Sequence, residues 1–333
     1  MVSMDSGDRA EQRSRAGCQR IVLAAFTTQT PSVRLSACWL IHLNAMIAHD
    51  RTYEYEIILR TVPAQQGLIY SGGAKMKPNF VRDLLYSRHA PDGFSDEIFI
   101  VLDLDTLPLK PYGQLVRDAS NQDWELMLMR EPTVSGNGEV NGGVIAFRDT
   151  RRVRRLIDGW RRVVNCPAYP NTLGNQVALN ALTGKHVGIL DVPRRRDPTG
   201  EDQRLILKAG VESCIRAAGY NKSAFRAELG SRVIHWPRGR VTGVLHEVTN
   251  QTVVYHGIMT RDKLKLMKEA LGRSGYRTMY GSPWCSAKAW SPRDIGDTAW
   301  RTPEVNTSTE AAADTPCMLV KPVPPDSVVR FMY

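Results

Sequence analysis

Apolar residues recur along the first third of the chain in two alternating patterns, which predict strands and helices in turn. Runs typical of strands occupy residues 20–28, 53–62 and 97–105. Between them, apolar residues spaced three and four apart predict helices over 32–48 and 77–88. This β-α-β-α-β order favours an α/β fold, with a mainly parallel sheet and helices on both of its faces.

The pattern continues over the middle of the chain and weakens towards both ends. The further strands are expected at 124–131, 142–149, 186–192 and 251–257, and the further helices at 150–164, 174–183 and 261–271. Residues 1–19 are polar and predict a flexible N-terminal extension. Seven of the nineteen prolines lie in 281–333, where little periodicity remains. We therefore expect a single domain over 20–272 and a proline-rich C-terminal tail or extension over 273–333.

Two aspartates follow the third predicted strand directly. In the stretch "IFIVLDLDTLPLKP" at 98–111, apolar residues typical of a buried central strand lead into Asp103 and Asp105. Residues two apart on a strand point to the same side, so the carboxylates are expected about 6–7 Å apart at the carboxyl end of the strand, where open α/β sheets bind ligands. Like charges so placed repel unless a positive group lies between them. The pair therefore predicts a divalent metal site, and the alternative is that both residues cap a loop or pair with arginine.

Composition narrows the class of protein. The chain has 333 residues, 42% of them hydrophobic, and a net charge of +10. This content suits a large folded core, and the charge favours anionic partners. Much of the charge is arginine at 148–162, but apolar residues recur there at helical spacing, so we expect the arginines on a solvated helix face. No apolar run approaches the roughly 20 residues of a membrane-spanning helix. Motifs of nucleic-acid-binding modules are absent from the sequence, so nucleic acid is not an expected partner.

The cysteines bear on metal binding and on the cellular compartment. They are scattered, with no Cys-x-x-Cys pair, at Cys18, Cys38, Cys166, Cys214, Cys285 and Cys317. Such spacing argues against a zinc site. We expect reduced thiols in a cytoplasmic protein.

Four short stretches, in the same order, resemble motifs of one enzyme family. "VLDLDTLPLKP" resembles the Asp-x-Asp segment of metal-dependent nucleotide-sugar glycosyltransferases of the GT-A fold, especially glycosyltransferase family 8, which includes the glycogenins. "VNGGVIAFRDT" at 140–150 is similar to the family's Asn-x-Gly strand, and "NQVALN" at 175–180 to its Asp-Gln-x-x-Leu-Asn helix start. "VVYHGIMTRDKLK" at 253–265 is similar to its metal and phosphate loop, without the family's Lys-Pro-Trp ending. The resemblance covers 20–270 and implies a Rossmann-like GT-A domain, a mixed, mainly parallel sheet flanked by helices.

The resemblance implies a role for each matching residue at the donor site. Asp105 would bind a divalent metal, manganese or magnesium, with His256 as the third protein ligand. Asp103 would share the metal or hold the ribose. The other candidates for contacts to the nucleotide and its phosphates are Thr27, Thr28, Lys77, Leu104, Gly142, Gly143, and Lys263 or Lys265.

The same resemblance implies a sugar transfer. Gln176, or Asn175 in place of the family's acid, would lie beside the reacting sugar carbon, and Asn141 would contact the sugar. The donor would be a UDP-sugar, and the acceptor an unidentified glycan, protein or small molecule. Family 8 membership would imply retention, in which the leaving phosphate takes the acceptor's proton. An inverting mechanism would instead take its base from among Glu131, Glu139 and Asp191.

Two other functions fit parts of the sequence. In a haloacid dehalogenase-type phosphatase, Asp103 would be the nucleophile and Asp105 a general acid. Against this, Thr106 stands one place too early, and no Gly-Asp-x-x-x-Asp segment follows. A non-enzymatic binder of sugar nucleotides or polyanions is favoured by the net charge and by Asn175.

Overall fold

The computed structural model describes residues 19–27, 50, 52–61, 71–87, 93–130, 140–170, 174–183, 203–220, 230–237, 239–257 and 263–274. The helix expected at 32–48 and the strand expected at 186–192 lie outside these residues. So do nearly all of the expected N-terminal extension and C-terminal tail, and the division of the chain into domain and extensions stays a prediction.

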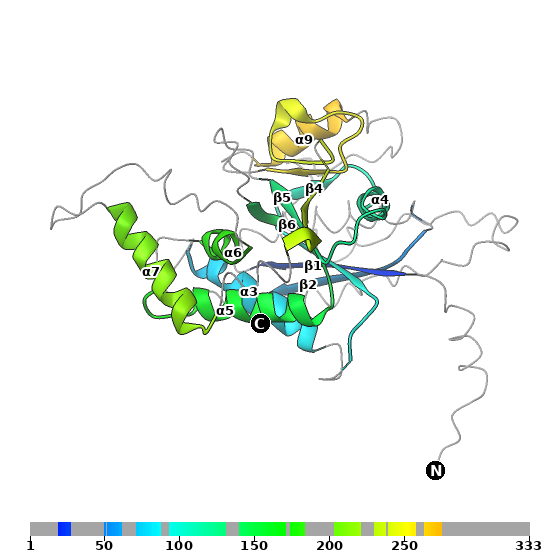
Figure 1. Cartoon of the computed structure of the whole chain (residues 1–333). Coiled ribbons are helices and arrows are strands. Elements are labelled where there is room, and N and C mark those ends of the chain that lie inside the picture. Colours follow the sequence, from blue (N-terminus) through cyan, green and yellow to red (C-terminus); the bar gives the residue numbers. More distant parts are fainter. Residues whose placement is uncertain are drawn as a thin grey trace, which may run out of the picture.

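Six strands form the central sheet, in the order β2-β1-β3-β6-β5-β7 (Figure 1). β1 runs parallel to β2 and β3, β6 runs antiparallel to β3 and β5, and β7 runs parallel to β5. The predicted α/β fold with a mixed, mainly parallel sheet is confirmed. The strands are β1 (Arg20–Thr27), β2 (Glu54–Thr61), β3 (Ile98–Leu102), β5 (Leu126–Arg130), β6 (Val140–Arg148) and β7 (Val233–His235).

Alternate residues of the central strands face two different cores. In β3, Phe99 and Val101 belong to one core and Ile98, Ile100 and Leu102 to the other, and all five are fully buried. A strand covered on both faces has this apolar pattern. Among the described helices, α3, α5, α6 and α7 pack on the first core, whereas α4 packs on the second. The bounds are α3 (Ser71–Tyr86), α4 (Gly113–Asp118), α5 (Arg151–Val164), α6 (Asn175–Thr183) and α7 (Gln203–Ala217).

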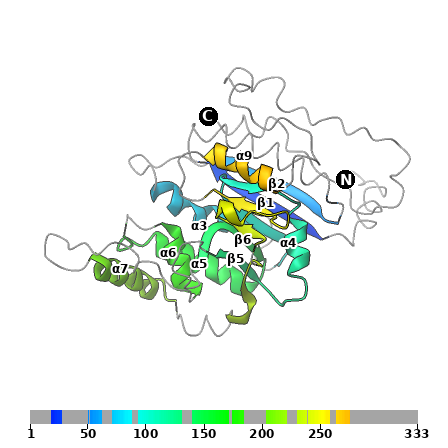
Figure 2. The same ribbon diagram turned by 90° about the horizontal axis from the view of Figure 1, so that it is seen from above.

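A second sheet, in the order β4-β9-β8, also covers the second core. Helix α9 packs against this small sheet, on the far side of the central sheet from α3 and α5 (Figures 1 and 2). Residues 103–105 alone connect β3 to β4, so the two sheets meet at the two aspartates. The bounds are β4 (Thr106–Pro108), β8 (Val241–Thr242), β9 (Val254–His256) and α9 (Lys263–Arg273), with 3₁₀ turns at Gly230–Arg232 and Leu245–Glu247.

Two helices differ from the sequence predictions. Helix α3 begins at Ser71 rather than near residue 77, and Pro78 lies inside it, although proline is typical of a helix start. Helix α7 was not predicted, because Leu205 and Ile206 interrupt its apolar pattern. They are 64% and 41% exposed. Its buried positions do recur at helical spacing, and they are Leu207, Val211, Cys214 and Ile215.

Helix α5 carries most of its arginines on its outer face, as expected, and two of them tie it to the sheet. Arg154 is buried, and its Nε and Nη2 donate to Asp149 at 2.6 and 2.7 Å. Arg152 forms an ion pair with the buried Glu125. Burial acts to raise the pKa of Glu125, but hydrogen bonds from Arg152 and Thr150 outweigh it, so this pKa lies below its ordinary value.

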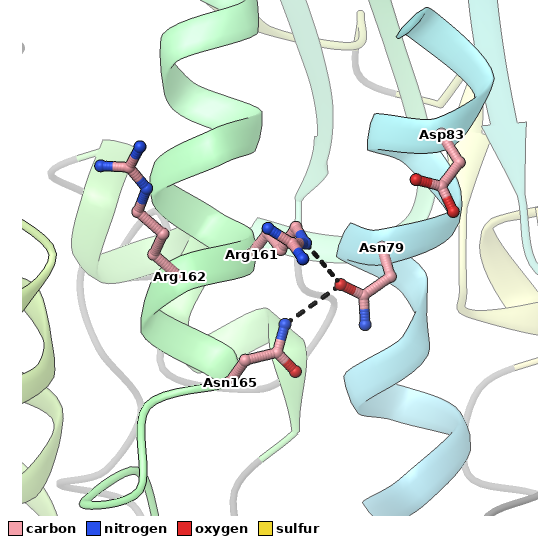
Figure 3. Close-up of a pocket in the computed structure, with 5 residues that line it drawn as sticks. All are labelled: Asn79, Asp83, Arg161, Arg162 and Asn165. Atoms are coloured by element: carbon pink, nitrogen blue, oxygen red, sulfur yellow. Dashed lines mark hydrogen bonds between the residues drawn. The ribbon is translucent and has the colours of Figure 1, made fainter. Parts of the chain in front are cut away.

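The other end of α5 contacts α3 through polar groups. Arg161 Nε and Asn165 Nδ2 donate to the same oxygen, Asn79 Oδ1, at 3.0 and 3.1 Å (Figure 3). Together with Asp83 and Arg162 these residues line a pocket of about 500 Å³. Its described lining residues include none of the candidate site residues, so this pocket is separate from the site described below.

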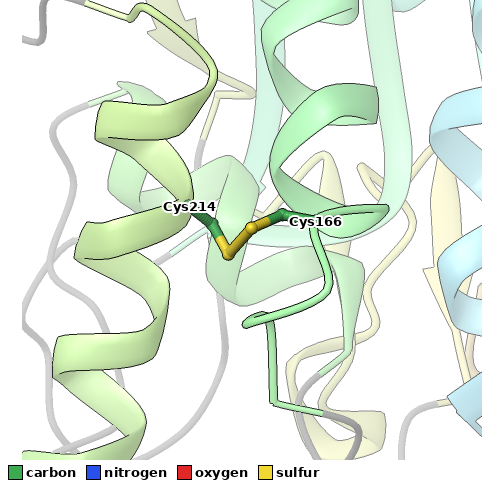
Figure 4. Close-up of a disulfide and its surroundings, with 2 residues drawn as sticks. All are labelled: Cys166 and Cys214. Carbon is green, nitrogen blue, oxygen red and sulfur yellow. A yellow bond between two sulfur atoms is a disulfide. The ribbon is translucent and has the colours of Figure 1, made fainter.

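A disulfide joins Cys166, just after α5, to Cys214 of α7 (Figure 4). The expectation of reduced thiols is therefore wrong for this pair; the other four cysteines lie outside the described residues. The two cysteines are 48 residues apart, and only the packing of α7 against α5 brings them together. Disulfides are rare in cytoplasmic proteins, which counts against the expected cytoplasmic location. That location stays a prediction.

Within the part of the chain that the structure describes, no helix is both long enough and apolar enough to cross a bilayer.

Removing the disulfide is expected to destabilise the fold. The double variant Cys166→Ser/Cys214→Ser should lose about 2–4 kcal/mol in the free energy of unfolding, because the bridge restricts the unfolded chain. Urea unfolding of the oxidised protein and of the variant measures this difference, and peptide mapping without reductant identifies the bridged pair. Equal midpoints, together with free Cys166 and Cys214 thiols in the native protein, would contradict the assignment.

Candidate active site

The two aspartates lie in a tight turn. The carbonyl of Asp103 accepts from the backbone N–H of Thr106 at 3.0 Å and from its hydroxyl at 2.6 Å. The carbonyl of Asp105 accepts from the N–H of Gly257 at 2.8 Å. The strand expected over 97–105 therefore ends before both aspartates. The turn, rather than strand alternation, brings their carboxylates to the same side.

His256 joins the two carboxylates from the second sheet. It ends β9, directly opposite Thr106 of β4. Its Nε2 lies 3.1 Å from Asp105 Oδ1 and 3.8 Å from Asp103 Oδ2. One ligand atom from each of the three residues lies within 4.8 Å of the others. Two carboxylate oxygens and an imidazole nitrogen form a donor set that suits manganese and other borderline divalent ions.

The imidazole of His256 is held by packing. The side chain is almost fully buried, and its Nδ1 makes no hydrogen bond to any residue that the structure describes. The ring lies directly against Gly143, so closely that a Cβ at that position would overlap it. The absence of a side chain at Gly143 is therefore what leaves room for the imidazole.

Lys77 supplies a positive charge beside the carboxylates. It projects from α3, is only 3% exposed, and its Nζ forms an ion pair with Asp103 Oδ1. The same Nζ donates to the carbonyl of Gly142 at 2.6 Å. A buried ammonium is costly unless it is paired and hydrogen-bonded, and here it is both. Lys77 therefore fixes the orientation of Asp103 relative to β6.

Gly142 and Gly143, here called the glycine pair, lie where β6 departs from β5. The register of β5 against β6 shifts between Leu128 and Met129, which pair with Ile145 and Asn141 respectively. The intervening residues of β6 have no partner in β5, so the strand bulges there. On its other side, the carbonyl of Gly143 still accepts from the N–H of Asp103 at 2.9 Å.

Three amide side chains surround the glycine pair. Asn141 Oδ1 accepts from the N–H of Gly143 at 2.7 Å, and Gln176 Oε1 from that of Gly142 at 3.2 Å. Asn175 is so near that a Cβ on Gly142 would lie 3.4 Å from its Oδ1. The structure thus brings together residues from α3, the turn after β3, β6, α6 and β9. Their roles in binding and catalysis stay predictions.

The structure places the remaining candidate residues for nucleotide and phosphate contacts only in part. Thr27 is the last residue of β1, but its side chain, the side chain of Lys263 and all of Thr28 lie outside what the structure describes. Leu104 lies in the turn with its side chain buried in the second core. Lys265 is exposed on α9.

Sequence reasoning did not single out Asn180, although it closes the "NQVALN" stretch. It is fully buried and binds the first residue of β6. The sequence did offer one signal for a buried role: Asn180 is a polar residue on the apolar side of the helix predicted at 174–183.

The comparisons with known proteins give structural likenesses only. No protein-family model matches the chain, and no curated protein matches it. The chain is similar to a glycosyltransferase involved in the glycosylation of the major capsid of PBCV-1, with 10% identity over 76% of this chain and 98% of that chain and a TM-score of 0.45. It is also similar to galactosyltransferase LgtC in complex with donor and acceptor sugar analogs (11% identity, 77% of this chain, 96% of that chain, TM-score 0.32). A further similar structure is mouse xyloside xylosyltransferase 1 (11% identity, 72% of this chain, 98% of that chain, TM-score 0.34). At such identities and TM-scores these likenesses carry no argument about activity.

Adding a methyl group at each glycine of the pair tests how the imidazole is seated. Gly143→Ala should destabilise the protein by about 1–3 kcal/mol, because its Cβ overlaps the His256 ring and forces it to move. Gly142→Ala is the matched control, since its Cβ would make ordinary contacts with Asn175 Oδ1 at 3.4 Å and Lys77 Nζ at 4.0 Å. Urea unfolding measures both variants. Equal stability of the two variants would show that His256 does not lie against Gly143.

Proposed function

We propose that the chain is a glycosyltransferase that transfers a sugar from a nucleotide diphosphate donor, a UDP-sugar, to an acceptor of unidentified class. The observation that carries the proposal is the cluster of Asp103, Asp105 and His256 at the carboxyl end of β3, with one ligand atom from each within 4.8 Å of the others. Open α/β sheets bind ligands at this edge. A cation site with amide side chains beside it suits a ligand that has a diphosphate at one end and sugar hydroxyls at the other.

The donor set supports a divalent ion, manganese or magnesium. Asp103, Asp105 and His256 would hold it, because the separations of 3.1 and 3.8 Å from the imidazole nitrogen to the carboxylate oxygens match those between neighbouring ligands of one ion. A metal bound there would act as a Lewis acid towards the diphosphate and neutralise the charge of the leaving group.

The chain's own residues would orient the donor. Lys77 holds Asp103 in place and adds a positive charge where the phosphates would lie. Asn141 and Gln176 flank the glycine pair, where the sugar ring of the donor would lie next to its diphosphate. In a retaining transfer the leaving phosphate accepts the acceptor's proton, so the site needs no separate general base.

Loss of one metal-binding carboxylate tests this function. Asp105→Ala should lower manganese-dependent UDP release from the best substrate in a panel of UDP-sugars by about 100-fold or more, because it removes both a ligand and a charge from the site. Asp123→Ala is the matched control, since the Asp123 carboxylate is 74% exposed and pairs with Arg232 away from the cluster.

Circular dichroism of both variants checks that the fold is intact. Full activity of a folded Asp105→Ala protein would refute the proposal. Release of phosphate from phosphomonoesters, with no UDP from any sugar nucleotide, would favour a phosphatase instead.

A further inference from the structure

A buried side-chain amide takes the place of a strand beside β6. Asn180 of α6 is fully buried; its Oδ1 accepts from the N–H of Val140 at 2.7 Å, and its Nδ2 donates to the Val140 carbonyl at 2.9 Å. Residues of adjacent antiparallel strands exchange bonds in this way. The pairing of β3 with β6 ends at Leu102 and Val144, so β3 does not reach Val140. The amide of Asn180 therefore bonds the backbone of β6 at a residue that β3 does not reach, although β5 still pairs with it.

The same amide also binds the helix one turn earlier. Asn180 Nδ2 donates to the carbonyl of Gln176 at 3.0 Å. Gln176 in turn accepts from the N–H of Gly142 through its own side chain at 3.2 Å. Residues four apart on a helix lie on one face, so Asn180 and Gln176 both face β6. Hydrogen bonds thus link Val140 to Asn180, Asn180 to Gln176 and Gln176 to Gly142, and the backbone of β6 closes this loop between α6 and β6.

Two further hydrogen bonds tie the start of α6 to the helical layer. Trp160 Nε1 donates to the carbonyl of Asn175 at 2.8 Å. Tyr169 donates its hydroxyl proton to the carbonyl of Gly174 at 2.7 Å. These contacts fix the start of the helix against α5 and the turn that follows it. Asn180, by contrast, bonds α6 directly to β6, two residues from Gly142.

We propose that Asn180 is a positioning residue that sets Gln176 against the glycine pair, and that it acts through Gln176 without touching the donor. The catalytic importance of this position rests on the proposed function, whereas the positioning itself does not. Asn180→Asp is nearly isosteric, and its carboxylate still accepts from Val140. Its carboxylate cannot donate to the carbonyls of Val140 and Gln176, and its protonated form has one donor proton where the amide has two. At least one of these carbonyls would therefore lose its partner in the loop.

Amide hydrogen exchange of the full chain tests the positioning without any activity. Thr183→Ala is the matched control, because Thr183 Oγ1 donates only within α6, to Leu179 at 2.8 Å and Asn180 at 3.4 Å. In Asn180→Asp the Gly142 amide should exchange about 10-fold faster or more, because weakening its bond raises the open fraction. Thr183→Ala should leave this rate near that of the wild type. Unchanged protection of Gly142 in Asn180→Asp would overturn the proposal.

A second variant, Asn180→Ser, tests the positioning if Asn180→Asp does not fold. Asn180→Ser keeps a donor and an acceptor but shortens their reach, so it should fold and still release the Gly142 amide. Wild-type protection of Gly142 in a folded Asn180→Ser protein would likewise overturn the positioning.

Kinetics then separate positioning from a general structural role. For donor hydrolysis, Asn180→Asp should lower kcat by about 10-fold and leave KM within about 2-fold, as expected for a residue that orients another. In a Gln176→Ala background the Asn180→Asp substitution should have no further effect, because both act through one group. Independent, multiplicative losses would overturn the proposal. If the wild type releases no UDP, the proposed function fails, and hydrogen exchange alone decides the role of Asn180.

Discussion

The close approach of two side chains to a bare stretch of backbone is the constraint on which the whole site depends. The imidazole of His256 lies against Gly143, and the ammonium of Lys77 binds the carbonyl of Gly142. Neither contact needs an unusual backbone conformation at the glycines, but the imidazole does need the space that a side chain on Gly143 would fill. Because β6 bulges away from β5 at this point, its polar groups turn towards α3, α6 and the turn that holds Asp103.

The charges of the site balance one another only in part. Lys77 pairs with one oxygen of Asp103, and His256 lies next to an oxygen of Asp105. The two carboxylates carry more negative charge than the Lys77 ammonium offsets. A divalent cation at the junction of the two sheets would offset the rest. The junction itself follows from the tight turn after β3, since the chain enters the second sheet within three residues. Residues 103–105 thus both connect the two sheets and carry the two carboxylates of the site.

Sequence patterns predicted the sheet class because strands buried on both faces read as continuous apolar runs. They placed Asp103 and Asp105 together at the carboxyl end of a buried strand, and His256 joined them as the resemblance implied. They failed where the outcome depends on distant packing. The Cys166–Cys214 bridge needs α7 against α5, and the turn at Asp103 needs a partner strand in β9. The buried role of Asn180 needs α6 packed beside the start of β6. No local signal carries these long-range contacts.

In the proposed function, Asp103, Asp105 and His256 together bind one divalent cation that carries the diphosphate of a sugar donor. A crystal structure with manganese and UDP tests it most directly, because manganese has an anomalous signal. We expect one anomalous peak about 2.0–2.3 Å from an oxygen of each aspartate and from Nε2 of His256, with the diphosphate completing the coordination. UDP bound without a metal peak there, or a peak at other residues, would contradict it.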